Sequence, residues 1–223
     1  AEVEYLCKAV NNYLEHPLTP KDAIWRYSGV RPLLDDGSDN ASNVTRDYTL
    51  LVDSPLGEGP MLTVLGGKLT TYRRLAEHAV EKLKPFFPNL GKNWTYQEPL
   101  PGGEIAEGWL GFEKWQLELL IRYPLLNQAW LKAFSRRYGA LSDQILAGAE
   151  SMQDLGKHFG GGLYECEVRY LYEQEWAWQP DDVLWRRTKT GLHMTEVQRQ
   201  VFSAWFNEQK AQWQPDARIA QAV

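Results

Sequence analysis

A pair of glycines separates a strand-like segment from a helix-like segment in the first half of the chain. In TVLGGKLTTYRRLAEHAV, residues 63–80, the apolar Val64 and Leu65 precede Gly66 and Gly67, and apolar positions at helical spacing follow. Glycine adopts positive φ and lets the backbone come close to a ligand. A helix start carries N–H groups without intrahelical acceptors and a partial positive charge. This junction therefore predicts a binding place for an anion, or for a ring oxygen that becomes anionic.

The residues after the glycines support this prediction, but they do not exclude an ordinary turn. Lys68 adds a full positive charge, and Thr70 or Thr71 can cap the helix. The spacing is not that of a P-loop, which requires GxxxxGK followed by Ser or Thr. From the residues alone, an ordinary strand–turn–helix with a glycine turn remains an open alternative.

Two arginines lie on neighbouring segments that read as extended. Arg31 stands in YSGVRP and Arg46 in TRDY, and two guanidinium groups close together can bind a phosphate or carboxylate bidentately. The alternative is that each arginine pairs with a nearby acid. The candidate acids are Asp35, Asp36 and Asp47.

The periodicity of the first part predicts helices around a small antiparallel sheet. The expected elements are a helix from the N-terminus to about residue 15, strands at 24–34, 44–53 and 61–66, and a helix of about 15 residues that stops at Pro85. The last two strands form a hairpin with a long turn. Strand edges left without partners favour dimerisation.

Beyond a Gly- and Pro-rich linker at 89–104 the pattern is helical. We expect helices at roughly 112–122, 125–138, 142–149, 163–175 and 181–190, and a last helix that opens at a Thr195–Gln198 capping box. The predicted fold class is α+β. Its predicted domains are a partial binding domain at 1–100 and an all-helical domain at 101–223.

Composition and missing motifs exclude several classes of protein. The chain has 24 basic and 29 acidic residues, a net charge of −5, and so lacks the basic balance of a general nucleic-acid binder. Its four histidines and two cysteines form no metal-ligand spacing, and no metal site is predicted. The loop DDGSDNASN departs from the calcium-loop pattern. Neither GxGxxG nor GxSxG occurs, which leaves the chain without a dinucleotide fingerprint or hydrolase elbow.

The chain begins without Met inside an amphipathic helical pattern, and we expect it to be a fragment of a longer protein.

Four segments together resemble the aerobic, FAD-dependent glycerol-3-phosphate dehydrogenase family, in the D-amino-acid-oxidase-like superfamily. These segments are WRYSGVRPLLDDGSDNASNVTRDYTL, LTVLGGKLTTYRRLAEHAVEKL, PLPGG and DDVLWRRTKTGL. No single motif decides the match, but their joint order covers nearly all of the chain. The chain is similar to the C-terminal part of that enzyme, without the N-terminal flavin-binding region.

This resemblance implies a specific chemistry. The family oxidises sn-glycerol 3-phosphate to dihydroxyacetone phosphate, with hydride transfer from substrate C2 to N5 of FAD and electrons passing on to quinone. By resemblance, Arg31 and Arg46 bind the substrate phosphate. The cofactor-binding residues are Gly66, Gly67, Lys68, Leu69 and Thr70, beside the pyrimidine end of the flavin.

The resemblance also implies partners and a location. It predicts a homodimer in the cytoplasm, associated peripherally with the inner face of the cell membrane. No catalytic base is assigned in this chain, and the fragment alone is expected to be inactive. Two alternatives stay open, a non-catalytic helical interaction module and a glycerol-3-phosphate oxidase that uses oxygen in place of quinone.

Overall fold

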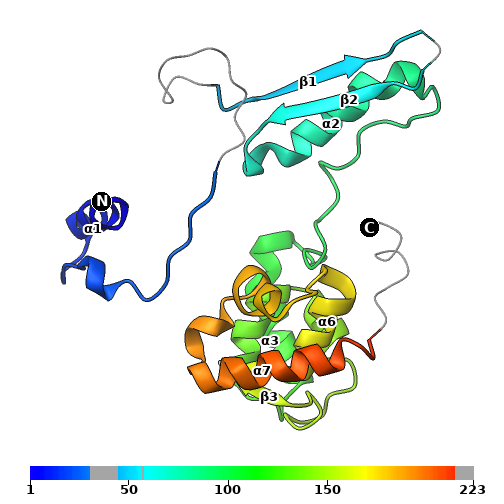
Figure 1. The fold of residues 1–223 in the computed structure, drawn as a ribbon. Helices are drawn as coiled ribbons and strands as arrows, with labels where there is room; N and C mark the ends of the chain where they lie inside the picture. Colours follow the sequence, from blue (N-terminus) through cyan, green and yellow to red (C-terminus); the bar gives the residue numbers. More distant parts are fainter. Residues whose placement is uncertain (31–44, 57, 214–223) are drawn as a thin grey trace. The chain divides into compact units, whose positions relative to one another are not determined.

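The computed structural model describes residues 1–30, 45–56 and 58–213, and Figure 1 shows the ribbon. Packing contacts divide the chain into two units. One unit is Arg26–Pro99, and the other combines Ala1–Trp25 with the chain from Leu100 onward. The α+β class is confirmed, since helices dominate and the strands are few. The predicted domains, 1–100 and 101–223, stay a prediction.

The Arg26–Pro99 unit is a two-stranded antiparallel sheet with one helix packed against it (Figure 1). Its elements are β1 (Tyr48–Asp53), β2 (Met61–Gly66), a 3₁₀ turn (Leu69–Thr71), α2 (Tyr72–Leu83) and a second 3₁₀ turn (Lys84–Phe86). The predicted hairpin is confirmed, with Tyr48 opposite Gly66 and Asp53 opposite Met61. Pro85 lies in the 3₁₀ turn that follows α2, as expected for a residue that cannot continue a helix.

The strand predicted at 24–34 is wrong for the part that the structure describes. Residues 24–30 form no strand, and residues 31–34 lie outside the described residues. Ile24, Tyr27 and Val30 lie three positions apart, which is not the two-residue period of a strand, and all three are exposed. A strand needs a partner for its backbone N–H and C=O groups, and no described strand pairs with this segment.

The second unit is mainly helical. Its helices are α3 (Phe112–Arg122), α4 (Gln128–Tyr138), α5 (Leu141–Ile145), α6 (Glu165–Glu175) and α7 (Glu196–Gln209), with a π-helical turn (Asp182–Arg187) and 3₁₀ turns (Gly108–Gly111 and Thr190–His193). One apolar core joins them, and its fully buried members include Leu119, Leu131, Phe134, Val168, Phe202 and Phe206. The helices predicted at 142–149 and 163–175 are shorter at one end than the sequence suggested.

A small hairpin corrects the prediction that this part is all-helical. β3 (His158–Gly160) pairs with β4 (Leu163–Tyr164) through glycines with positive φ. The indole N–H of Trp130 donates to the Gly162 carbonyl at 2.7 Å, which fixes the hairpin on α4. Strands this short have too few residues to show a period of two, so the pattern was indistinguishable from the start of a helix.

The N-terminal segment joins this unit through an aromatic stack. It contains α1 (Glu2–Val10) and two 3₁₀ turns (Asn11–Tyr13 and Pro20–Asp22). The Trp25 ring stacks on the Trp185 ring with centroids 5.9 Å apart and an interplanar angle of 10°. Lys189 Nζ lies 4.7 Å from the centre of the Trp25 ring, and Arg199 Cζ lies 6.0 Å from that of Trp185. Two cations and two indoles thus form one ladder, in which cation–π attraction adds to stacking.

Helix capping follows the sequence closely in α7. The Thr195 hydroxyl accepts from the Gln198 N–H at 3.2 Å, and the Gln198 side chain accepts from the Thr195 N–H at 2.8 Å, which confirms the capping box.

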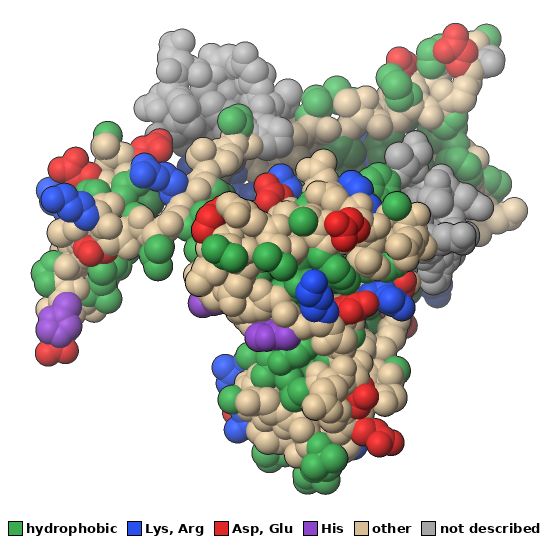
Figure 2. Space-filling model, turned by 60° about the horizontal axis from the view of Figure 1, so that its bottom comes forward, with side chains coloured by type: hydrophobic (Ala, Val, Ile, Leu, Met, Phe, Trp, Pro, Cys, Tyr) green, Lys and Arg blue, Asp and Glu red, His purple; other side chains and the backbone are tan. Residues whose placement is uncertain are grey.

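On the face shown in Figure 2, acidic and basic side chains lie interspersed with hydrophobic ones. Among the described residues, no helix combines the length and hydropathy needed to cross a membrane.

Candidate functional site

The turn between β2 and α2 depends on its two glycines. Gly66 has φ 72° and Gly67 has φ 103°, a region that residues with a side chain rarely adopt. A Cβ on Gly67 would lie 3.1 Å from Leu75 Cδ1 and 3.3 Å from Tyr48 Cβ. Both the backbone angle and the close packing therefore require glycine here. The predicted role of these positions as a tight turn has a physical basis in this geometry.

The residues after the turn present a helix start to an open surface. Lys68 is extended, with φ −84° and ψ 147°, and the Thr71 N–H and hydroxyl both donate to its carbonyl, at 3.0 and 2.9 Å. Lys68, Leu69 and Thr70 are exposed, and the Leu69 side chain is 88% exposed. The first N–H groups of a helical segment have no acceptor within it and carry partial positive charge. Thr71 thus closes the turn, and Lys68, Leu69 and Thr70 stay accessible to a ligand.

The two predicted phosphate ligands differ in what the structure says of them. Arg46 is exposed and forms no salt bridge with any described residue, Asp47 included. Arg31 lies outside the described residues, as do Asp35 and Asp36. Tyr48 lies opposite Gly66 at one end of the hairpin. Arg46 stands two positions before Tyr48, and Lys68 stands two positions after Gly66. Arg46 and Lys68 therefore lie at the same end of the hairpin.

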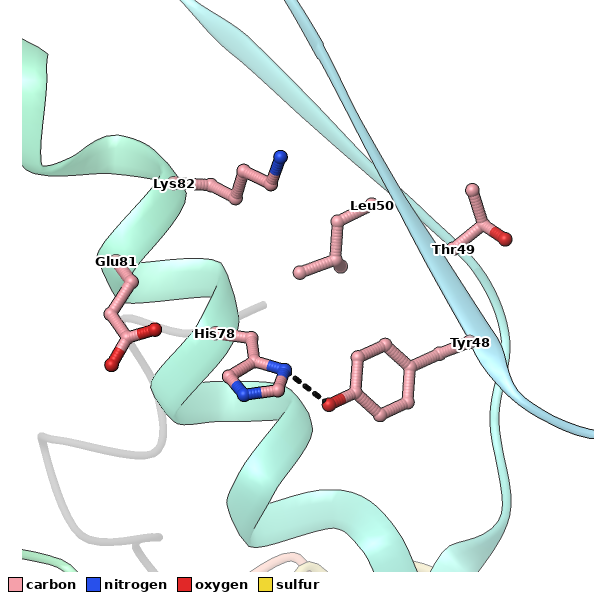
Figure 3. A pocket seen from close by; sticks show the side chains of 6 residues that line it. All are labelled: Tyr48, Thr49, Leu50, His78, Glu81 and Lys82. Atoms are coloured by element: carbon pink, nitrogen blue, oxygen red, sulfur yellow. Dashed lines mark hydrogen bonds between the residues drawn. The ribbon is translucent and has the colours of Figure 1, made fainter.

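A hollow of about 570 Å³ lies between β1 and α2 (Figure 3). Tyr48, Thr49 and Leu50 line it from β1, and His78, Glu81 and Lys82 line it from α2. In Figure 3 the Tyr48 side chain reaches across toward α2, and its hydroxyl lies 2.5 Å from His78 Nδ1.

The sequence pattern does not single out either residue of this pair. One signal was available, since Arg46 and Tyr48 lie two positions apart and would share a side of a continuous strand. In the structure β1 begins at Tyr48 and the chain bends at Asp47, so Arg46 lies just outside the strand. The contact with His78 joins residues 30 positions apart, and no local pattern reports it.

A buried carboxylate ties the segment after α2 to the helix. Glu77 is 6% exposed, and its carboxylate accepts from Thr95 Oγ1 at 2.8 Å, Arg73 Nη1 at 2.6 Å and Arg74 Nη1 at 3.1 Å. The hydrogen bond from Thr95, followed by the two arginines, lowers the pKa of Glu77 below its usual range. Both of its carboxylate oxygens are satisfied within the unit, so Glu77 has a structural role.

The helical unit has one fully buried carboxylate of its own. Glu167 Oε1 accepts from the Tyr138 hydroxyl at 2.7 Å and lies 3.4 Å from Arg137 Nε, and Oε2 has no hydrogen-bond partner among the described residues. Burial raises the pKa of Glu167, while Arg137 and Tyr138 lower it. In the part of the chain that the structure describes, no group of three or more His, Cys, Asp or Glu side chains is arranged to hold a metal ion.

Comparison with known proteins shows the family to which the chain belongs. Residues 94–216 match the family model described as the C-terminal domain of alpha-glycerophosphate oxidase. The chain belongs to this family. The match covers more than half of the chain, and the resemblance found in the sequence is confirmed.

Curated relatives extend the similarity to the Arg26–Pro99 unit. The chain is 46% identical to D-erythritol 1-phosphate dehydrogenase of Brucella abortus over 92% of its length, and 44% identical to aerobic glycerol-3-phosphate dehydrogenase of Escherichia coli over 93%. It is 46% identical to glycerol-3-phosphate dehydrogenase of Pseudomonas aeruginosa over 89% of its length. The chain spans about 40% of the length of these relatives: 40%, 41% and 38%, respectively.

Proposed function

We propose that the whole protein is a flavoprotein dehydrogenase that oxidises sn-glycerol 3-phosphate to dihydroxyacetone phosphate. The observation that carries this proposal is the Gly66–Gly67 turn, which opens into an exposed helix start in a chain whose relatives are named as polyol-phosphate dehydrogenases. The turn supplies the backbone geometry for a bound ring, and the family supplies the chemistry.

The residues at this helix start fit the edge of an isoalloxazine ring. FAD held here would supply the hydride acceptor for C2 of the substrate, with quinone as the final electron acceptor. Gly66 and Gly67 let the backbone approach the ring. The Lys68 ammonium and the N–H groups of Leu69 and Thr70 at the helix start would stabilise negative charge on a bound ring, because fixed dipoles and a cation need no reorganisation.

The role proposed for Arg31 and Arg46 is to hold the substrate phosphate. A guanidinium group makes two parallel hydrogen bonds to a phosphate, which fixes the orientation of the substrate as well as its affinity. Arg46 is exposed and forms no salt bridge with a described acid, so no described carboxylate competes with a phosphate for it. No catalytic base is assigned among the residues of this chain.

The same proposal has three further parts, which rest on the family resemblance. The electron acceptor is quinone, the protein is a homodimer, and it lies peripherally on the inner face of the cell membrane. The isolated chain is expected to bind FAD weakly or not at all and to be inactive. This expectation rests on the sequence, which contains no GxGxxG, the motif that binds the pyrophosphate of FAD in dinucleotide-binding folds.

One observation favours a second substrate. The relative from Brucella abortus is named for D-erythritol 1-phosphate and is as similar to this chain as the glycerol-3-phosphate dehydrogenases are. Both substrates are polyol phosphates, so an arginine pair that binds a terminal phosphate serves either of them. The family model also carries the name of an oxidase, which keeps oxygen as an alternative acceptor.

The test is made on the whole protein with bound flavin. Anaerobic addition of glycerol 3-phosphate should bleach the flavin absorbance, and erythritol 1-phosphate is tested beside it. In Arg46→Ala, the loss of a charge-assisted contact predicts a rise in KM on the order of a hundredfold. Arg122→Ala removes an exposed guanidinium that pairs with Asp143 at 2.7 Å, and should leave KM unchanged.

Three outcomes would contradict parts of the proposal. Flavin that bleaches with erythritol 1-phosphate alone would replace the substrate. Normal kinetics in Arg46→Ala would remove the phosphate role from this residue. A well-folded whole protein that binds no flavin would favour a non-catalytic helical interaction module.

A further inference from the structure

Tyr48 contacts both the glycine turn and α2 in the Arg26–Pro99 unit. Its backbone lies opposite Gly66, and its Cβ would be 3.3 Å from a Cβ on Gly67. Its hydroxyl reaches His78 Nδ1 at 2.5 Å, in the middle of α2. One side chain therefore spans from the glycine turn to the helix that this turn begins.

The hydrogen bond between Tyr48 and His78 is a specific contact. Both residues are half-buried, and their rings lie 5.8 Å apart, centroid to centroid, with an interplanar angle of 56°. Figure 3 shows the hydrogen bond from the Tyr48 hydroxyl to the imidazole Nδ1. The contact lies at one side of the hollow described above, so it leaves the rest of that space open.

The position of this bond links the two halves of the site. Arg46 stands two residues before Tyr48, and Lys68 stands two residues after Gly66, at the same end of the hairpin. The hairpin ladder ends at the Tyr48–Gly66 pair, so main-chain pairing does not hold Arg46 beyond that point. The next tie along β1 is the Tyr48 side chain, which anchors the strand end to α2.

We propose that the Tyr48–His78 hydrogen bond positions Arg46 at the end of the hairpin that bears the Gly66–Thr70 turn, and so sets how tightly Arg46 binds the substrate phosphate. This inference rests on the proposed function. Tyr48 and His78 are positioning residues, since they act through Arg46 and the turn and touch neither phosphate nor ring. A binding group that is already held in place loses less conformational freedom when its ligand binds, so the loss of this bond weakens the affinity for phosphate.

The test uses the whole flavin-loaded protein and four variants. Tyr48→Phe and His78→Leu each remove the bond, and His78→Asn keeps a polar group close to the place of Nδ1. Tyr96→Phe is the matched control, because it also removes one hydroxyl, from a tyrosine of the same unit that is 81% exposed. KM and kcat for the polyol phosphate are measured, together with calorimetric binding of inorganic phosphate.

The expected result is a split between the two kinetic constants. Tyr48→Phe and His78→Leu should raise KM and weaken phosphate binding on the order of tenfold, with kcat changed far less. The double variant should match the single ones because both act on one contact. His78→Asn should recover most of the affinity, and Tyr96→Phe should leave both constants unchanged.

A purely structural bond would give a different pattern. Equal falls in kcat and stability with KM unchanged, or additive effects in the double variant, would overturn the inference. A wild-type protein that binds phosphate but oxidises neither polyol phosphate would contradict the proposed function alone, since phosphate binding still reports on Tyr48. A wild-type protein that does neither would overturn both.

Discussion

At the scale of single residues, Gly67 is the position where the structure leaves least freedom. Its φ of 103° and the contacts of a would-be Cβ with Leu75 and Tyr48 make any side chain costly. Gly67→Ala should lower the free energy of unfolding by about 1–3 kcal/mol, the usual cost of a residue held in such a region.

Urea denaturation of the chain measures this cost, and Gly59→Ala is the matched control. A methyl group added at Gly59 would meet no heavy atom within 4 Å, and this glycine has no positive φ. Equal stability of the two alanine variants would show that the turn does not require glycine.

At the scale of elements, the packing of α6 on α4 depends on Glu167. Burial raises its pKa, so the folded protein binds the proton more tightly than the unfolded chain does. The contribution of this group to stability is complete at pH values below the usual range of glutamate. It is lost as the pH rises through the raised pKa.

Glu167→Gln keeps an oxygen that can accept from the Tyr138 hydroxyl and removes the titration. We therefore expect the Tm of the wild type, relative to that of the variant, to fall as the pH rises above the usual range of glutamate. Thermal melts from this range upward measure the difference. Glu118→Gln, an exposed change of the same charge on α3, should show no such trend. A constant difference for Glu167→Gln would mean that Arg137 keeps the carboxylate ionised throughout.

At the scale of the whole molecule, the Trp25–Trp185 stack fastens the N-terminal segment to the helical unit. An aromatic pair of this kind contributes about 1 kcal/mol, so Trp25→Ala should raise the detached population about fivefold. Trypsin should then cleave at Lys21 and Arg26 faster by a similar factor, followed by mass spectrometry. Tyr13→Ala, at an 88% exposed ring, is the control, and equal cleavage in both variants would refute the fastening.

The same scale shows which features could be predicted from the sequence. The glycine turn and the Thr195 capping box were predictable because each is fixed by neighbours a few residues apart. The Tyr48–His78 contact and the Trp25 stack were not, because they join residues distant in the chain. A glutamate within a helix is usually exposed to solvent, and only the packing of the folded chain reveals that Glu167 is buried.

The hairpin has consequences for how the chain behaves in solution. Leu51 and Met61 project from the sheet with 52% and 59% of their side chains exposed, and Leu56 in the turn is fully exposed. Exposed apolar side chains next to unpaired strand edges favour association between copies of the chain, so self-association competes with the monomer. The light scattered by a solution of the isolated chain should therefore grow faster than linearly with protein concentration. A dilute solution should stay free of visible aggregates.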